Sequence, residues 1–168
     1  MRIEAVLADI AEQNVDAIVN AANSQLSHGA GVAAAIANAA GSDLERASAE
    51  HPEVPVGEAA WTTAGNLNAR WVIHAVGPIW SGGDRGEPEL LAGAYRSALG
   101  VADELGARSI AFPSISTGIY GFPLHQAAAI AVDAVRGASN GHLSIELIRF
   151  CLFSDGDLAA YREALNAE

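Results

Sequence analysis

Two glycine loops, each lying between an apolar strand and a helix, carry the residue types that could hold an anion. The first loop contains Asn23, Gly29 and Gly31 and follows the apolar stretch 17–19, which is typical of a buried strand. A helix of small residues is predicted over 32–40, and its first free N–H groups face the loop. This arrangement suits a phosphate, because glycine lets the backbone approach a ligand and a helix N-terminus attracts negative charge. A tight packing turn would explain the same two glycines.

The second loop, residues 114–121, repeats the design. It follows an apolar strand over 109–113 and precedes a helix that Pro123 can begin, since the missing N–H of proline costs nothing there. The loop offers hydroxyl groups, a glycine and two larger side chains: Ser114, Ser116, Thr117, Gly118, Ile119 and Tyr120. Two strand–loop–helix units of one design indicate two phosphates, or one diphosphate held from both sides.

The elements that must position these loops alternate along the chain, which predicts an α/β fold. Further strands are expected over 2–7, 58–63, 71–76 and 144–153, and further helices over 42–50, 87–106, 124–136 and 156–165. Two polar residues lie within the apolar strands. We expect Asn20 to hydrogen-bond loop backbone and His74 to be a core histidine whose ring nitrogens are satisfied.

Composition narrows the class of partner. The 168 residues are the length of one domain, so a single domain over 1–168 is expected. The chain has 20 acidic and 9 basic residues, a net charge of −11, and contains no lysine. This balance argues against binding to nucleic acid or to an anionic membrane, both of which need clustered positive charge. An anion site in such a chain should be built from backbone N–H groups and helix N-termini.

Cysteine use argues against thiol chemistry. Cys151 is the only cysteine, so no internal disulfide can form, and it lies in a predicted core strand. No apolar run reaches the length of a membrane span. We expect a cytoplasmic monomer that uses no metal ion and no cofactor.

Four motifs, in this order along the chain, resemble the macrodomain family, whose members bind ADP-ribose. They are NAAN at 20–23, HGAGVA at 28–33, VIHAVGP at 72–78 and SISTGIYG at 114–121. The resemblance runs from about Ile3 to Leu165. It implies a three-layer α/β/α fold with a mixed central sheet. The body of the chain resembles bacterial and mitochondrial-type mono-ADP-ribosyl hydrolases, whereas its first loop resembles the viral-type subgroup.

The resemblance implies a role for each part of the site. Asn23 and His28 would flank the distal ribose as catalytic residues, and Asp9 and Phe153 would hold the adenine. Asp9 could instead cap the next turn, His28 could be a solvated or capping side chain, and Tyr120 could be a plain packing aromatic. The residues expected to bind the ligand are Asp9, Ile10, Asn23, Gly29, Gly31, Val32, Ala33, Ser114, Ser116, Thr117, Gly118, Ile119, Tyr120 and Phe153.

Two alanines depart from the family's pattern. Ala30 replaces a glycine common in the first loop and would be strained if that position needs a positive φ. Ala33 stands where the hydrolases that the chain otherwise resembles have an aspartate that positions a water. Hydrolysis would then need a water held by the ligand's own diphosphate together with Asn23 or His28.

The first hypothesis is therefore an enzyme that binds ADP-ribose and hydrolyses ADP-ribosyl esters, either mono-ADP-ribosylated acidic side chains or O-acetyl-ADP-ribose. The alternative is a non-catalytic reader of ADP-ribose, which Ala33 makes credible. A third reading, a Rossmann-type enzyme that uses an intact dinucleotide, is weakened because the first turn lacks the GxGxxG spacing.

Overall fold

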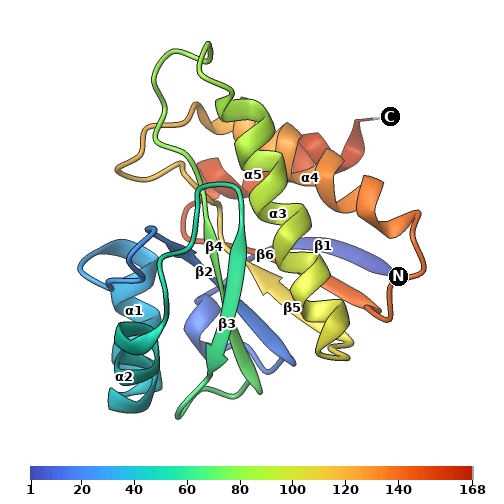
Figure 1. Cartoon of the computed structure of the whole chain (residues 1–168). Helices are drawn as coiled ribbons and strands as arrows, with labels where there is room; N and C mark the ends of the chain where they lie inside the picture. The colour runs from blue at the N-terminus through green and yellow to red at the C-terminus, as the bar shows by residue number, and fades with distance from the viewer. Residues whose placement is uncertain (168) are drawn as a thin grey trace.

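A computed structural model gives the fold and describes residues 1–167. Six strands and five α-helices are interspersed along the described chain (Figure 1). The strands are β1 (Arg2–Leu7), β2 (Ala17–Ala22), β3 (Ala59–Thr63), β4 (Trp71–Val76), β5 (Ser109–Phe112) and β6 (Leu147–Leu152). The helices are α1 (Gly31–Ala40), α2 (Ser42–Glu50), α3 (Glu87–Glu104), α4 (Leu124–Ser139) and α5 (Asp155–Asn166), and a short 3-10 helix, η1, spans Ile10–Glu12. None of the described helices is long and apolar enough to cross a membrane.

The strands form one mixed sheet in the order β1-β6-β5-β2-β4-β3. All neighbours are parallel except β3, which pairs antiparallel with β4 at one edge. The carboxyl ends of β1, β6, β5, β2 and β4 therefore meet at the same side of the sheet. Both glycine loops leave the sheet there, as ligand-binding loops of open α/β sheets do.

Helices cover both faces of the sheet, which gives three layers (Figure 1). On one face α1 and α2 pack through Ile36, Ala37 and Leu44 against inward residues of β2 and β4. On the other face lie α3, α4 and α5, around a core rich in aromatic residues. Burial on both faces explains why the central strands read as nearly continuous apolar runs. The predicted three-layer fold with a mixed sheet is confirmed.

The predicted helices over 32–40 and 42–50 are confirmed as α1 and α2, and Gly41, whose φ of 88° lies outside the helical region, separates them. One predicted strand begins too early, for a local reason. The strand predicted from Ser144 begins only at Leu147. The Ser144 N–H and hydroxyl both donate to the Asp103 carboxylate, which holds this segment away from the sheet.

Candidate functional site

A cavity of about 380 Å³ opens at the carboxyl ends of β2 and β5. We call residues 23–33 its first wall and residues 114–121 its second wall. Ten of the predicted ligand-binding residues line it, namely Asn23, Gly29, Gly31, Val32, Ala33, Ser114, Ser116, Gly118, Ile119 and Tyr120. The predicted residues that do not line it are Asp9, Ile10, His28, Thr117 and Phe153. Ala30 and Ile115, which belong to the two predicted loops, also line it, whereas sequence reasoning missed Ala21, Ala22, Ser27 and Gly77.

The first wall ends in the N-terminus of α1. Gly31 begins the helix with a φ of 61°, whereas Ala30 before it is extended with a φ of −157°, so Ala30 carries no strain. No side chain within residues 1–167 caps the helix, and residues 31–33 line the cavity. The first backbone N–H groups of a helix have no partner within it, so those of α1 are available to an anion.

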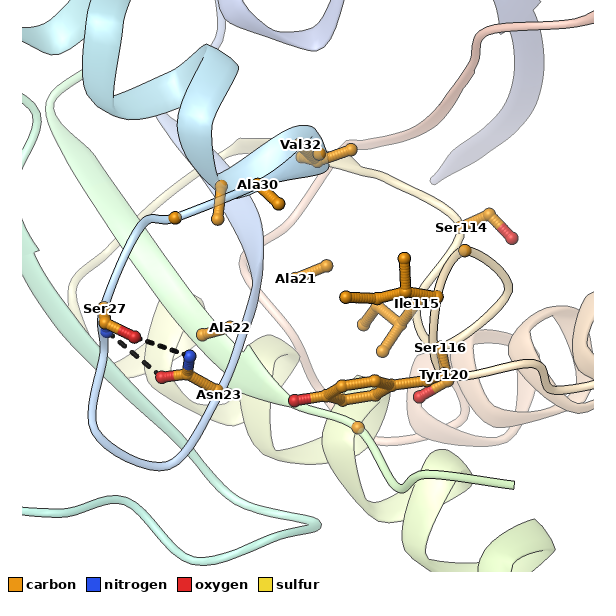
Figure 2. A pocket seen from close by; sticks show the side chains of 16 residues that line it. Ala21, Ala22, Asn23, Ser27, Ala30, Val32, Ser114, Ile115, Ser116 and Tyr120 are labelled. Carbon is orange, nitrogen blue, oxygen red and sulfur yellow. Dashed lines mark hydrogen bonds between the residues drawn. The ribbon is translucent and has the colours of Figure 1, made fainter. Parts of the chain in front are cut away.

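Asn23 and Tyr120 face one another from opposite walls (Figure 2). The Asn23 Nδ2 donates to the Ser27 hydroxyl at 2.7 Å, and its Oδ1 accepts from the Ser27 backbone N–H at 3.1 Å. These bonds fix the plane of the amide, yet they leave it one N–H and one lone pair for a ligand. Ser27 follows Asn23 by four residues, a spacing that a search for loops closed by asparagine side chains would have found.

The second wall is tightly packed at its base. Ser116 has a φ of 67°, unusual for a residue other than glycine, and is 6% exposed. Its hydroxyl has no partner among the described residues. The Ser116 side chain lies against Gly77. A Cβ added at Gly77 would come within 2.2 Å of the Ser116 Oγ and 2.4 Å of the Ile115 Cγ2. Only glycine at position 77 therefore allows β4 and this wall to approach so closely.

Two buried tyrosines hold the second wall from the helices behind it. The Tyr95 hydroxyl of α3 accepts from the Ile115 N–H at 3.1 Å and contacts the Tyr161 hydroxyl at 3.3 Å. The Tyr161 hydroxyl of α5 donates to the Ser114 Oγ at 2.9 Å, and the Thr117 hydroxyl donates to the same atom at 2.7 Å. Burial raises the pKa of both tyrosines, so these groups stay neutral at ordinary pH. Thr117 thus supports the wall from outside the cavity.

Histidines hold the first wall instead. The Asn20 amide donates from Nδ2 to the Nδ1 of His74 at 3.0 Å and contacts the Nδ1 of His28 at 3.5 Å. An amide N–H can only donate, so the His74 proton lies on Nε2, which is 2.8 Å from the Thr62 hydroxyl. The prediction that His74 is a satisfied core histidine is confirmed. The prediction that Asn20 bonds loop backbone is wrong, because its amide nitrogen is taken by imidazoles from β4 and from the first wall, and its Oδ1 has no partner among the described residues.

The His28 side chain points away from the cavity surface. Its Nε2 is 2.8 Å from the Ser48 hydroxyl of α2, and its ring lies 5.6 Å from that of His74. Burial lowers the pKa of His28, although Glu45 opposes the shift. Burial also lowers the pKa of His74 to about 3, with His28 and His51 adding to the shift. Both imidazoles are therefore neutral at pH 7, and the structure ties His28 to α2 rather than to the cavity.

The residues predicted to hold adenine lie further along the same side of the sheet. Leu7 of β1 pairs with Leu152 of β6, so Asp9 and Phe153 follow neighbouring strands. Asp9 is exposed and its Oδ1 accepts from the Ala11 N–H at 2.9 Å, which caps η1. Phe153 is 55% exposed. Ile10 is fully buried in the core, so its side chain does not reach this surface.

The cavity has almost no charge of its own. Tyr120 is the only ionisable side chain among the residues that line it. No group of three His, Cys, Asp or Glu side chains within residues 1–167 could hold a metal ion.

The Cys151 thiol is not a nucleophile. Cys151 is buried in β6, and burial raises its pKa to about 12, which makes a nucleophilic thiolate unavailable. The site can bind an anion through backbone N–H groups and can offer amide and hydroxyl groups to a polar ligand.

Known proteins are similar to this chain in fold and in sequence. The sequence model of the Macro domain matches residues 19–131. A macro domain-containing protein of Chlorobaculum tepidum is 53% identical over 165 residues, which cover 98% of this chain and 96% of that protein. A mutant Oceanobacillus iheyensis macrodomain whose structure was solved with ADPR has a TM-score of 0.89 at 40% identity, covering 97% of this chain and 90% of the other.

A Trypanosoma brucei macrodomain in complex with ADP-ribose has a TM-score of 0.91 at 34% identity, covering 98% of this chain and 69% of the other. The family model matches well over half of the chain, and the relatives are similar to it over nearly its whole length. The chain belongs to the macrodomain family.

Proposed function

We propose that the protein binds ADP-ribose and hydrolyses ADP-ribosyl esters. The observation that carries this proposal is the uncharged cavity in which the Tyr120 side chain points toward Asn23, beside the free N-terminus of α1. The solved relatives with ADPR and with ADP-ribose support the choice of ligand.

The order of the strands suggests how the ligand lies. The sheet brings the ends of β1, β6, β5 and β2 into one row, with Asp9 and Phe153 at one end and Asn23 at the other. The adenine would stack on Phe153 with its amine toward Asp9, because an exposed π-face and a carboxylate suit a purine. The diphosphate would lie between the walls, on the N–H groups of α1. The distal ribose would then reach Asn23.

Hydrolysis of such an ester does not require the protein to protonate the leaving group. Hydrolysis of a glutamate-linked ester at the anomeric carbon forms a bond from water to that carbon and breaks the bond to the carboxylate oxygen. The leaving carboxylate is stable as an anion near pH 7, so it needs no general acid. The water's proton passes to a diphosphate oxygen or to solvent. The Asn23 amide orients the ribose hydroxyls, and its bonds to Ser27 hold it in place beforehand.

His28 has a different role in this proposal from the one that the sequence motif implies. Its ring bonds to Ser48 and contacts Asn20, so it would anchor the first wall and keep Asn23 in register rather than touch the water. A His28→Gln variant, whose amide can replace part of these bonds, should retain more activity than His28→Ala.

A reader that binds ADP-ribose without turnover is the second candidate. The observation that favours it is the absence of any carboxylate among the residues that line the cavity, where Ala33 occupies the first turn of α1. Binding alone does not separate the two functions.

The test is release of free ADP-ribose from a glutamate-linked mono-ADP-ribosylated protein, with O-acetyl-ADP-ribose as a second substrate and the protein in excess over both. Release that depends on Asn23 supports the hydrolase. ADP-ribose binding without release from either ester supports the reader, and failure to bind ADP-ribose rejects both.

A further inference from the structure

The segment 77–86 between β4 and α3 is organised by one buried carboxylate. Glu87, the first residue of α3, is 2% exposed. Its Oε2 accepts from the Ser81 N–H at 2.9 Å and from the Gly83 N–H at 2.8 Å, and its Oε1 accepts from the Arg85 N–H at 2.6 Å. Three backbone amides of one loop therefore converge on a single side chain.

Only an ionised carboxylate fits this arrangement. It accepts hydrogen bonds at both oxygens, whereas an amide in its place would present an N–H to at least one of the same donors. Burial alone would raise the pKa of Glu87, but the N–H groups of Ser81, Gly83 and Arg85 hold it at about 2. The carboxylate therefore stays ionised at physiological pH and can accept all three hydrogen bonds.

In this conformation the loop packs against the Trp80 ring. A Cβ added at Gly83 would lie 2.9 Å from the Trp80 ring, so the two are in close contact. The Trp80 ring packs in turn on Phe122, with 4.7 Å between ring centroids. The Trp80 backbone N–H donates to the Tyr120 carbonyl oxygen at 2.9 Å. The loop is therefore bonded to the second wall at the residue whose ring faces Asn23 (Figure 2).

We propose that Glu87 is a positioning residue for the ligand cavity, which acts through the loop 81–85 and Trp80 to set the position of Tyr120 opposite Asn23. Glu87 is not among the residues that line the cavity. The inference rests on the proposed binding of ADP-ribose, because it assigns Tyr120 a place beside that ligand.

The test compares Glu87→Gln with Glu89→Gln. Glu89 lies two residues further in the first turn of α3 but is exposed and pairs with Arg96, so its variant is a matched control. Amide hydrogen exchange of Ser81, Gly83 and Arg85 reports the loop without any ligand. Titration with ADP-ribose, at a temperature where both variants are fully folded, reports the cavity.

We expect Glu87→Gln to speed exchange at the three amides by about tenfold or more, because a hydrogen bond to a charged group is lost. The same variant should weaken ADP-ribose binding by about fivefold, and Glu89→Gln should change neither quantity. Faster exchange with unchanged affinity would overturn the inference, since Glu87 would then support only the loop. Unchanged exchange would overturn it as well. Failure of the wild type to bind ADP-ribose would reject the proposed function and this inference together.

A second variant covers the case in which Glu87→Gln does not fold. Trp80→Leu removes the contact with Phe122 and leaves the carboxylate in place. It should weaken ADP-ribose binding while the amides bonded to Glu87 stay protected from exchange. Unchanged affinity in Trp80→Leu would show that the loop does not act on the second wall, which would also overturn the inference.

Discussion

The two walls of the cavity are supported by different chemistry. Behind the first wall lies a chain of imidazole and amide groups formed by His28, Asn20 and His74. Behind the second wall lie the hydroxyl groups of Tyr95 and Tyr161. An imidazole that unfolding exposes to water gains a proton near pH 6.5, whereas tyrosine hydroxyls do not titrate until pH 10 or above. The first wall should therefore be sensitive to acid and the second wall should not.

The difference extends to what each wall offers a ligand. The first wall presents an amide held by Ser27 and a free helix N-terminus, which suit a ribose and a phosphate. The second wall presents the Tyr120 ring and the backbone around Gly118. In our account only the first wall does the chemistry, through Asn23, whereas both walls hold the ligand, and the following experiments test that division.

The largest effect is expected from Asn23→Ala. Loss of the amide should lower the rate of ADP-ribose release on the order of 10²–10³-fold, because the ribose is no longer oriented. The affinity for ADP-ribose should change by less than about tenfold, since the diphosphate contacts remain. Single-turnover release and calorimetry measure the two quantities. Ser27→Ala is the matched control, because it removes the partner of the amide but not the amide. Equal losses of rate and affinity in Asn23→Ala would remove the distinction between the walls.

Gly77→Ala should disrupt the packing at the base of the second wall. The new Cβ would collide with Ser116 and Ile115, so we expect the free energy of unfolding to fall by about 1–3 kcal/mol. Affinity for ADP-ribose should fall with it. Denaturant unfolding and calorimetry measure these changes. Gly118→Ala is the control for stability, because no atom lies within 4 Å of a Cβ there. A stable Gly77→Ala protein with normal affinity would contradict the close approach seen between β4 and this wall.

Acid should destabilise the protein through His74. Its pKa is about 3 in the folded protein against an ordinary value of 6.5, so between those values only the unfolded chain binds the proton. Stability therefore rises with pH through this window and is lost on acidification. From pH 7 to pH 5 this one group should lower the free energy of unfolding by about 2 kcal/mol. Denaturant unfolding at the two pH values measures the loss, and His74→Gln should reduce it by the same amount. If the unfolding free energy of His74→Gln fell as much between pH 7 and pH 5 as that of the wild type, other groups would be responsible for the acid sensitivity.

The smallest effects are expected from Tyr95→Phe and Tyr161→Phe. Each variant keeps the ring in the core and removes one hydroxyl, so each should cost about 1 kcal/mol of stability. The cost should be the same at pH 7 and pH 5, in contrast to the effect of His74. Thermal unfolding at both pH values would measure it. A cost that changed with pH would show that the second wall is not insulated from titration.

Much of the fold, and the residues of each wall that line the cavity, could be predicted from local sequence. The glycine loops, the position of Asn23 after a buried strand and the helix that begins at Gly31 all depend on residues close together in the chain. Local patterns of apolar residues and glycines decide such features. The mixed central sheet was implied by the family resemblance, because periodicity does not determine which strands are neighbours.

The supports behind the walls could not be predicted in this way. The direction of the His28 side chain depends on Ser48, twenty residues away on another helix, and on Asn20 in a strand. The close contact of Gly77 with Ser116 depends on how two loops from separate strands meet. The role of Glu87 depends on a loop that folds back over the start of its own helix. Each of these contacts is set by tertiary packing and has no local pattern.

The structure of the protein crystallised with ADP-ribose tests the division of the walls most directly. Our account predicts the adenine on Phe153 near Asp9, the diphosphate on the N–H groups at the start of α1, and the distal ribose within hydrogen-bond distance of the Asn23 amide. A ligand bound in the reverse direction, with its adenine between Asn23 and Tyr120, would contradict the account, because the bond to be cleaved would then lie far from the Asn23 amide.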